Sequence, residues 1–281
     1  MVPSLESLSC GLGSVKLGGL LVLAVLGGCA VTSTDTTEKA TTDDALRSAA
    51  TLNTIVRGKT LCRDTKADNA ICGVEHWTMF ANKDGSRHLH VASDNIRTGD
   101  SRHAVLWIDE TDRVRDAYVH STKAGRSVGS SYIVLNDDEA YVAVDDSQFD
   151  GGDGGVKLTV LDQPDTQNSI GTGPVSADVA QFVDYDQQQG GPQAKSVYWV
   201  GGRNNTMVGG FFGAENTFVG VEAMTLVDGN EVEASHYRMR TGTEIWVLEP
   251  YDVLLKIRLA FGATKGQVYE TVELSISEQI F

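Results

Sequence analysis

The feature that most limits how this chain can fold is a succession of short runs rich in β-branched and aromatic residues. Beyond residue 58 these runs alternate with Gly, Asp and Asn, and no stretch shows the periodicity of an amphipathic helix. Turns such as Asp84-Gly85 and Asp228-Gly229 supply positive φ angles or side-chain caps. Connections of hairpin length join antiparallel neighbours, so the pattern predicts an antiparallel β-meander. The predicted strands are Val74–Ala81, Arg87–Ser93, Ala104–Ile108, Arg113–Ser121, Ser127–Leu135, Ala140–Asp145, Val156–Leu161, Ser196–Val200, Phe218–Val227, Glu231–Arg240, Thr243–Leu248, Val253–Phe261 and Gln267–Ser277.

The last two predicted strands each have an apolar face that must be covered. Alternate positions from Val253 to Phe261 are apolar, with Lys256 and Arg258 between them. Since no helix is predicted to cover such faces, the sheet must close on itself or pack on a second sheet. The sequence therefore predicts an all-β fold, a curved antiparallel meander that forms a half-barrel or open barrel.

A weak internal similarity suggests that the meander is built from two tandem repeats. Gly73-Val-Glu75 leads to Asp84-Gly85 and then to a Trp strand, and Gly220-Val-Glu222 leads likewise to Asp228-Gly229 and a second Trp strand. Chance similarity between two meanders is the alternative. If the repeat is real, the bowl has an N-terminal half over residues 58–165 and a C-terminal half over residues 166–281.

An apolar run near the N-terminus is typical of a secretory signal. The run Leu17–Leu26 is shorter than the ~20 residues that a membrane-spanning helix needs, but it suits a signal peptide. Leu26-Gly27-Gly28-Cys29 follows and resembles the lipobox of bacterial lipoproteins, whose cysteine receives diacylglycerol. The alternative is an ordinary signal peptide with a chance cysteine. The sequence predicts a signal peptide over residues 1–28 and lipidation of Cys29.

The residues behind Cys29 predict where the protein is anchored. Ala30 rather than Asp follows the cysteine, and by the sorting rule of that lipoprotein family this implies the outer membrane, on its periplasmic side. Residues 29–57 are rich in Thr, Ser, Asp and Ala, and such a composition cannot bury enough apolar surface to offset its ordering entropy. We therefore expect a flexible tether over residues 29–57.

The remaining cysteines indicate the redox compartment of the protein, and its net charge limits the classes of partner that it can bind. Of the four cysteines, Cys10 leaves with the signal and Cys29 is lipidated, so Cys62 and Cys72 are expected to form a disulfide in an oxidising compartment. The net charge of −15 argues against nucleic acid and against anionic lipid headgroups as partners, because both reward clustered Lys and Arg.

Short landmarks along the chain resemble a poorly characterised group of exported bacterial β-bowl proteins of unknown function. The resemblance extends from Glu75 to the C-terminus and implies the bowl-like fold, but the group carries no activity to transfer. The landmarks are Asp84-Gly-Ser-Arg87, Gly129-Ser-Ser-Tyr132, Gly171-Thr-Gly-Pro174 with Asp178, Phe218-Val-Gly220, Ser235-His-Tyr-Arg238, Glu244-Ile-Trp246 and Tyr269-Glu270.

Two sets of side chains are candidates for chemistry. His88 and His90 point to one face of a strand and are close enough to share a metal ion, or else are two solvent-facing imidazoles. Glu270 occupies an apolar-face position, where an unpaired carboxylate is costly. With His236 and Arg238 it forms a candidate catalytic set, and a structural Glu–Arg pair is the alternative.

Three functions remain open at this stage. The first is a lipid-anchored module that binds a hydrophobic small molecule or acyl chain in the bowl. The second is a cofactor-free lyase, isomerase or hydrolase that acts on a hydrophobic substrate; motifs for serine hydrolases, zinc proteases and nucleotide binding are absent. The third is a structural or assembly lipoprotein of the envelope. No cofactor is expected, with a metal at the histidine pair as the exception.

Overall fold

The computed structural model describes residues 53–111, 113–136, 139–145, 155–162, 168–181, 196–199, 208–209, 216–227, 229–248 and 251–279. All described residues belong to one compact unit, Leu46–Phe281. In this part of the chain, no helix has both the length and the apolar character needed to span a membrane.

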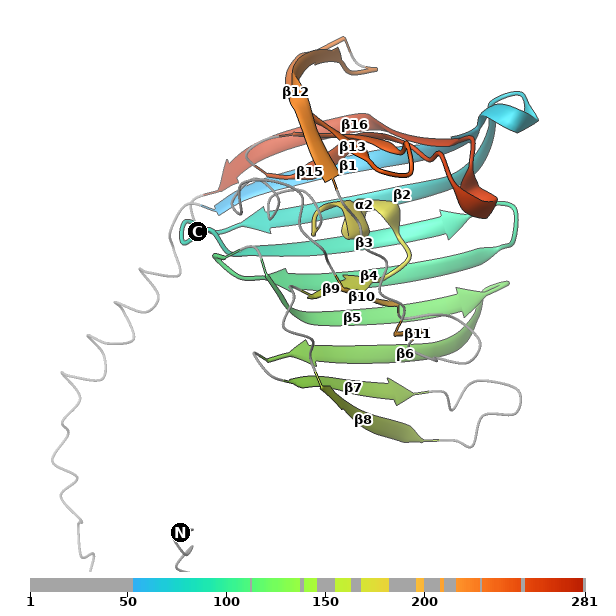
Figure 1. Cartoon of the computed structure of the whole chain (residues 1–281), viewed down its shortest axis with the longest axis vertical. Helices are drawn as coiled ribbons and strands as arrows, with labels where there is room; N and C mark the ends of the chain where they lie inside the picture. The colour runs from blue at the N-terminus through green and yellow to red at the C-terminus, as the bar shows by residue number, and fades with distance from the viewer. Residues whose placement is uncertain are drawn as a thin grey trace, which may run out of the picture. The chain divides into compact units, whose positions relative to one another are not determined.

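Most of this unit is one antiparallel sheet of thirteen strands (Figure 1). The sheet begins with C-terminal strands and continues with N-terminal ones, because β16 pairs with β1. Among the described strands, β12 and β8 each have one neighbour, so the sheet is open. In sheet order the strands are β12 (Asn216–Thr225), β13 (Glu231–Met239), β14 (Glu244–Leu248), β15 (Val253–Arg258), β16 (Gln267–Gln279), β1 (Asn53–Asp64), β2 (Ala70–Ala81), β3 (Arg87–Asn95), β4 (Asp100–Ile108), β5 (Val114–Lys123), β6 (Arg126–Leu135), β7 (Glu139–Asp145) and β8 (Val156–Asp162).

A smaller group of elements lies on one face of this sheet. It contains a helix, α2 (Val175–Val179), and a three-stranded sheet in which β9 pairs parallel with β10 and β10 pairs antiparallel with β11. The strands are β9 (Asn168–Gly171), β10 (Ser196–Trp199) and β11 (Val208–Gly209), and two 3₁₀ turns, η1 (Thr65–Ala67) and η2 (Gly262–Thr264), lie in connections of the large sheet.

The large sheet curls around α2. This helix contacts both β3 and β15, which are four positions apart in the sheet. In a flat sheet four positions span about 19 Å, more than a single helix bridges. Register shifts at six strand pairs, among them Lys59/Thr60 and Trp246/Val247, mark irregularities that increase local bending. We use inner face for the side of the sheet that is turned toward α2, and outer face for the opposite side.

The inner face is apolar and carries the core. Alternate residues of β2–β7 pack with Ala177 and Ala180 of the α2 segment in one buried cluster. Val179 of α2 belongs to a second buried cluster, in which it packs against residues of β13–β15 such as Tyr237. On β2 the indole of Trp77 lies over Gly58, where a Cβ atom would come within 2.1 Å of the ring, so this close packing needs glycine.

The structure confirms the predicted all-β antiparallel fold. Every predicted strand has its counterpart among β2–β8, β10 and β12–β16. The predicted Cys62–Cys72 disulfide is also confirmed, and it links β1 to β2 with a Cα–Cα distance of 5.2 Å. In the large sheet, β1–β8 and β12–β16 form two contiguous blocks that meet at the β16–β1 pair, while β9–β11 of the predicted C-terminal half belong to the smaller sheet. The tandem repeat and the domain boundaries stay predictions.

Of the described strands and helices, four have no counterpart among those predicted from the sequence, namely β1, β9, β11 and α2. Strand β1 begins at Asn53, inside the range expected as a tether. Its outer-face residues include Arg57 and Lys59, while Val56, Gly58 and Thr60 face inward. A strand with charged residues on one side and a glycine on the other lacks the apolar, β-branched signature that identified its neighbours.

Candidate functional site

A buried carboxylate on β2 holds the N-terminal end of α2. Glu75 is 2% exposed, and its oxygens accept hydrogen bonds from the backbone N–H groups of Val175 (2.7 Å) and Ser176 (2.8 Å). The hydroxyls of Ser176 and Ser93 donate to the same carboxylate at 2.6 and 3.3 Å. The first N–H groups of a helix lack partners within it, so a carboxylate is well placed there. Burial raises the pKa of Glu75, and these hydrogen bonds oppose the rise.

A second carboxylate lies in the same helix. Asp178 accepts hydrogen bonds from the N–H group (2.8 Å) and the hydroxyl (2.9 Å) of Thr172. Burial raises the pKa of Asp178 to about 7, and the charge of Glu75 adds to the rise. Burial and the same two carboxylates also raise the pKa of Tyr269 above its usual range. We name Glu75, Asp178 and Tyr269 the inner cluster.

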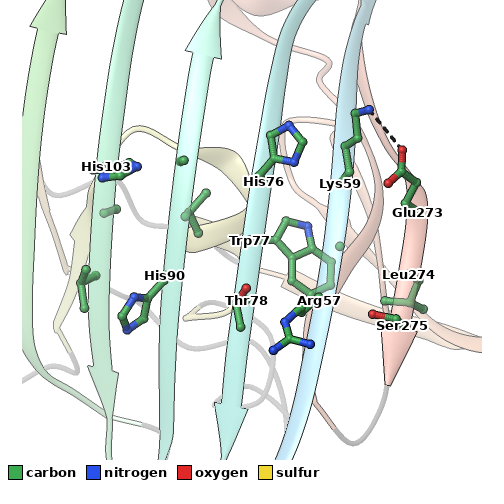
Figure 2. A pocket seen from close by; sticks show the side chains of 15 residues that line it. Arg57, Lys59, His76, Trp77, Thr78, His90, His103, Glu273, Leu274 and Ser275 are labelled. Carbon is green, nitrogen blue, oxygen red and sulfur yellow. Dashed lines mark hydrogen bonds and ion pairs between the residues drawn. The ribbon is translucent and has the colours of Figure 1, made fainter. Parts of the chain in front are cut away.

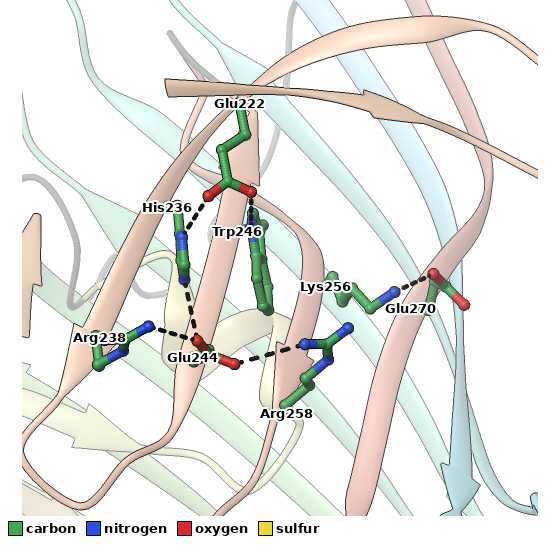
Figure 3. A network of polar contacts seen from close by, with 8 residues as sticks. All are labelled: Glu222, His236, Arg238, Glu244, Trp246, Lys256, Arg258 and Glu270. Carbon is green, nitrogen blue, oxygen red and sulfur yellow. Dashed lines mark hydrogen bonds and ion pairs between the residues drawn. The ribbon is translucent and has the colours of Figure 1, made fainter. Parts of the chain in front are cut away.

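Another set of polar side chains lies on the outer face of β12–β14 (Figure 3). Nδ1 of His236 lies 2.8 Å from Oε1 of Glu222, and its Nε2 lies 3.7 Å from Oε1 of Glu244. The indole N–H of Trp246 donates to Oε2 of Glu222 at 3.1 Å, and the Trp246 and His236 rings stack with centroids 4.4 Å apart. We name Glu222, His236, Glu244 and Trp246 the outer network.

Two arginines complete the surroundings of the outer network. Arg238 donates to Glu244 at 3.0 Å, and Arg258 lies 3.6 Å from the other oxygen of Glu244 and over the Trp246 ring. The hydrogen bond from Arg238 lowers the pKa of Glu244, and those from Trp246 and His236 lower the pKa of Glu222. Both carboxylates are therefore charged at neutral pH.

The outer network orients an imidazole but gives it little access to solvent. A general acid or base needs a ring nitrogen within reach of the substrate. His236 is 5% exposed, and its buried Nε2 atom makes no hydrogen bond among the described residues. The arrangement fixes the position of the His236 ring between two carboxylates, so the geometry supports a structural role for His236.

The predicted catalytic set, Glu270, His236 and Arg238, is brought to one face but not into contact. Cross-strand pairs connect Glu270 to Lys256, Lys256 to Trp246, and Trp246 to His236. Glu270 accepts a hydrogen bond from Lys256 at 2.7 Å (Figure 3). Arg238 is bound to Glu244 instead. The catalytic roles of these residues stay predictions.

Glu270 is predicted from the sequence to lie on the apolar face of its strand, but in the structure it lies on the outer face. Its side chain is 36% exposed and lies opposite Tyr269, which packs against the α2 cluster. The reason is a register shift, because Lys59 pairs with Glu273 whereas Thr60 pairs with Thr271. The intervening residue, Val272, changes the alternation along β16, so a strict period of two fails there.

A groove of about 530 Å³ lies on the outer face of β16, β1, β2, β3 and β4 (Figure 2). Along one cross-strand row stand Glu273, Lys59, His76, Ala92 and His103. The adjacent row carries Ser275, Arg57, Thr78, His90 and Val105. Lys59 donates to Glu273 at 3.1 Å, so one of the two strong cations is paired.

The predicted metal pair, His88 and His90, shares the outer face as expected. The His88 ring packs against Trp107 with centroids 3.6 Å apart, and His90 meets Phe80 edge-on at 5.7 Å. Burial and the nearby His90 lower the pKa of His88. Among the described residues, no three His, Cys, Asp or Glu side chains are arranged to hold a metal ion. A metal at this pair stays a prediction.

Glu75 is not among the site residues predicted from the sequence. The signal was nevertheless present, because Glu75 alternates with Gly73, Trp77 and Met79 on the inner face of β2. A carboxylate on the apolar face of a strand is the same feature that made Glu270 a candidate. Asp178 stood in one of the landmarks, but its helix is too short to give a periodic signal.

Comparison with known proteins adds distant structural likenesses. No protein-family model matches the chain, and no curated protein matches it. A β-barrel-like protein of the domain of unknown function DUF1849 from Brucella abortus is 9% identical with a TM-score of 0.45, over 80% of this chain and 98% of that chain. A DUF1329 family protein from Desulfovibrio piger is 11% identical with a TM-score of 0.19, over 86% of this chain and 93% of that chain.

Proposed function

We propose that the domain binds an apolar ligand of the acyl-chain class between the inner face of its sheet and the segment with β9 and α2. The observation that carries this proposal is that a five-residue helix, tied to the sheet by Glu75, covers an apolar inner face. A lipid on Cys29 would hold the domain at the periplasmic side of the outer membrane, where such ligands occur.

The inner face has the chemistry of an apolar binding site. Its buried side chains come from successive strands, and the cover contributes Ile170, Ala177 and Ala180 to the same cluster. An acyl chain can replace these contacts because hydrophobic burial is non-directional and scales with the apolar area removed from water. The sheet residues that face this cover include Leu89, Val91, Ala104, Leu106, Val119, Ile133 and Val142.

The cover is a weak element compared with the sheet. Isolated helices shorter than ~12 residues are marginal in water, so α2 depends on its docking contacts. Its N-terminal N–H groups bond to Glu75, and its apolar contacts come from few side chains. Displacing α2 from the sheet thus requires less free energy than separating a pair of strands. A ligand that binds the form with α2 displaced can increase the population of that form.

Binding of a dansyl-labelled undecanoic acid, followed by fluorescence, tests the proposal. We expect saturable binding to the wild type and about tenfold tighter binding to Glu75→Gln, because a loosened cover lowers the free energy needed to open the site. Ser176→Ala removes one hydrogen bond to Glu75 and should shift the affinity in the same direction by less.

Glu222→Gln is the matched control, because it makes the same substitution on the outer face. It should leave the affinity unchanged. Absence of saturable binding to wild type would contradict the proposal, and so would equal changes in Glu75→Gln and Glu222→Gln.

The anchor is tested separately from the ligand. Cys29→Ser should abolish labelling by a palmitate analogue and leave the precursor unprocessed, since the thiol is the atom that is acylated. Undiminished labelling of this variant would refute lipidation at Cys29. Binding of the dansyl probe by purified protein does not depend on this result.

A further inference from the structure

The groove on the outer face is lined by donors that the protein itself leaves unused. Of its fifteen lining residues, Arg57, His76 and His103 have no hydrogen-bond or ion-pair partner in the described part of the chain. His90 makes only a ring contact with Phe80 there. Polar groups that line a cavity without internal partners are available to a ligand.

These donors lie in two neighbouring cross-strand rows of the groove. Ala92 stands between His76 and His103 in the same cross-strand row, and His90 lies two residues from Ala92 on β3. The small side chain of Ala92 leaves space between the three imidazoles. Arg57 and Lys59 stand on the neighbouring strand β1, with Lys59 directly across from His76 (Figure 2).

The charge of the groove is opposite to that of the chain. The protein has a net charge of −15, yet Glu273 is the one acidic residue that lines this groove, against one arginine, one lysine and three histidines. A locally basic groove attracts anions. The surrounding negative charge repels a long polyanion such as a nucleic acid, so a small anion fits better.

We propose that this groove binds a small ligand through a phosphate-type oxyanion. A phosphate group offers three acceptor oxygens and up to two charges, which suit the guanidinium of Arg57 and several imidazole donors, while Lys59 stays paired with Glu273. A carboxylate offers two oxygens and would leave donors unused. The site is independent of the inner face, and it does not rest on the acyl-chain proposal.

The histidines allow a direct test with inorganic phosphate as the probe. The chain has six histidines, so its ¹H–¹³C spectrum of imidazole Cε1 groups is simple, and single His→Gln variants assign the peaks. At constant ionic strength, phosphate should shift the peaks of His76, His90 and His103 with one saturation curve. The peak of His236 serves as the internal reference, because this residue lies on β13 and does not line the groove, whereas His120 is the cross-strand neighbour of His103.

Two variants separate a specific contact from general electrostatics. Arg57→Gln should weaken phosphate binding at least tenfold. Arg63→Gln removes the same charge from the same strand outside the groove, and it should change the affinity less than twofold. Equal effects of the two variants would overturn the proposal.

A second arm distinguishes a lipid headgroup from a soluble phosphate. Dihexanoyl phosphatidic acid is titrated against the same three peaks. If its affinity is at least tenfold higher than that of phosphate, the source is a lipid headgroup. Equal affinities identify a soluble phosphate or phosphomonoester, and both results support the site. The absence of any saturable shift would overturn it, as would a response of these peaks to Zn²⁺ but not to phosphate.

Discussion

Glu75 and Glu222 are both strand carboxylates that accept hydrogen bonds from side chains and hold a neighbouring element, yet their pKa values move in opposite directions. Glu75 is 2% exposed on the inner face, and burial raises its pKa despite hydrogen bonds from Ser176, Val175 and Ser93. The side chain of Glu222 is 49% exposed on the outer face, and hydrogen bonds from Trp246 and His236 lower its pKa. Loss of hydration outweighs hydrogen bonding in the first case and not in the second.

The difference shows how one sheet supports two kinds of polar site. On the inner face a carboxylate serves as the attachment point of a cover, and its charge is costly. On the outer face carboxylates with arginines and an imidazole form an ordered surface network in which the charge is favourable. The predictions below separate these roles, from the largest expected effect to the smallest.

The largest effect is expected for Glu75→Gln. The amide places an N–H donor where the carboxylate accepts from Val175 or Ser176, so it weakens charge-assisted hydrogen bonds in a buried site. We expect the free energy of unfolding, measured with urea, to fall by about 2 kcal/mol. Glu222→Gln in the outer network should change it little. Similar losses in both variants would remove the distinction between the two faces.

The second prediction concerns the pH dependence of stability. The pKa of Asp178 is about 7 in the folded protein against 3.8 ordinarily, so between about pH 4 and 7 the folded state keeps a proton that the unfolded state has lost. The contribution of Asp178 to stability is thus present at low pH and lost as the pH rises to about 7. Asp178→Asn should remove this part of the pH dependence, measured as unfolding free energy from pH 4 to 8.

The outer network should show the opposite sign. The pKa of Glu222 and that of Glu244 are lowered in the folded protein, so their contribution is present above the ordinary value of 4.5 and is lost as the pH falls below it. Glu222→Gln should therefore remove part of the fall in stability below about pH 4.5 and leave the slope of the profile between about pH 5 and 8 unchanged. If Asp178→Asn and Glu222→Gln flatten the same pH range, the assigned environments are wrong.

The third prediction uses two tryptophans, one on each face. Trp77 is 3% exposed, donates to Thr60 at 3.0 Å and covers Gly58, so Trp77→Phe leaves a cavity and removes a buried hydrogen bond, although Thr60 keeps its hydrogen bond with Thr271. We expect a loss of about 2 kcal/mol in unfolding free energy. Trp246 is also buried, at 6% exposed, but its hydrogen bond goes to Glu222, whose side chain is 49% exposed, so water can replace this bond and we expect Trp246→Phe to lose about 1 kcal/mol less than Trp77→Phe. Equal losses would contradict this reasoning.

The sequence predicted the strands well, but it predicted the faces of β15 and β16 only in part, because the register shifts in both: Val253 and Ile257, expected on one face, lie on opposite faces of β15. All thirteen expected strands are present, because β-branched alternation and Gly- or Asp-containing turns report directly on the backbone. What failed was local register. The extra residue Val272 in β16 places Glu270 on the outer face. Such a bulge leaves no clear signature among the alternating valine, leucine and isoleucine residues of this strand.

The site residues were only partly predictable for a different reason. His236 and Arg238 were placed together on one strand face by their spacing, and this holds in the structure. Their partners Glu222 and Glu244 come from adjacent strands, and Glu75 meets α2 about a hundred residues away. Contacts between distant segments depend on the curl of the sheet, which periodicity does not encode.

The smallest effect is expected for Glu270→Gln, which decides the face on which Glu270 acts. Glu270 is paired with Lys256 at 2.7 Å, and their side chains are 36% and 20% exposed. Ion pairs with this access to water contribute about 0–1 kcal/mol, because hydration competes with the attraction. We expect unfolding free energy to fall by less than 1 kcal/mol, and the Glu270→Gln, Lys256→Gln double-mutant cycle to give a coupling of similar size that ~0.5 M salt reduces. A loss above ~2 kcal/mol that salt does not change would mean a buried, poorly hydrated carboxylate, and would put Glu270 with Glu75 rather than with Glu222.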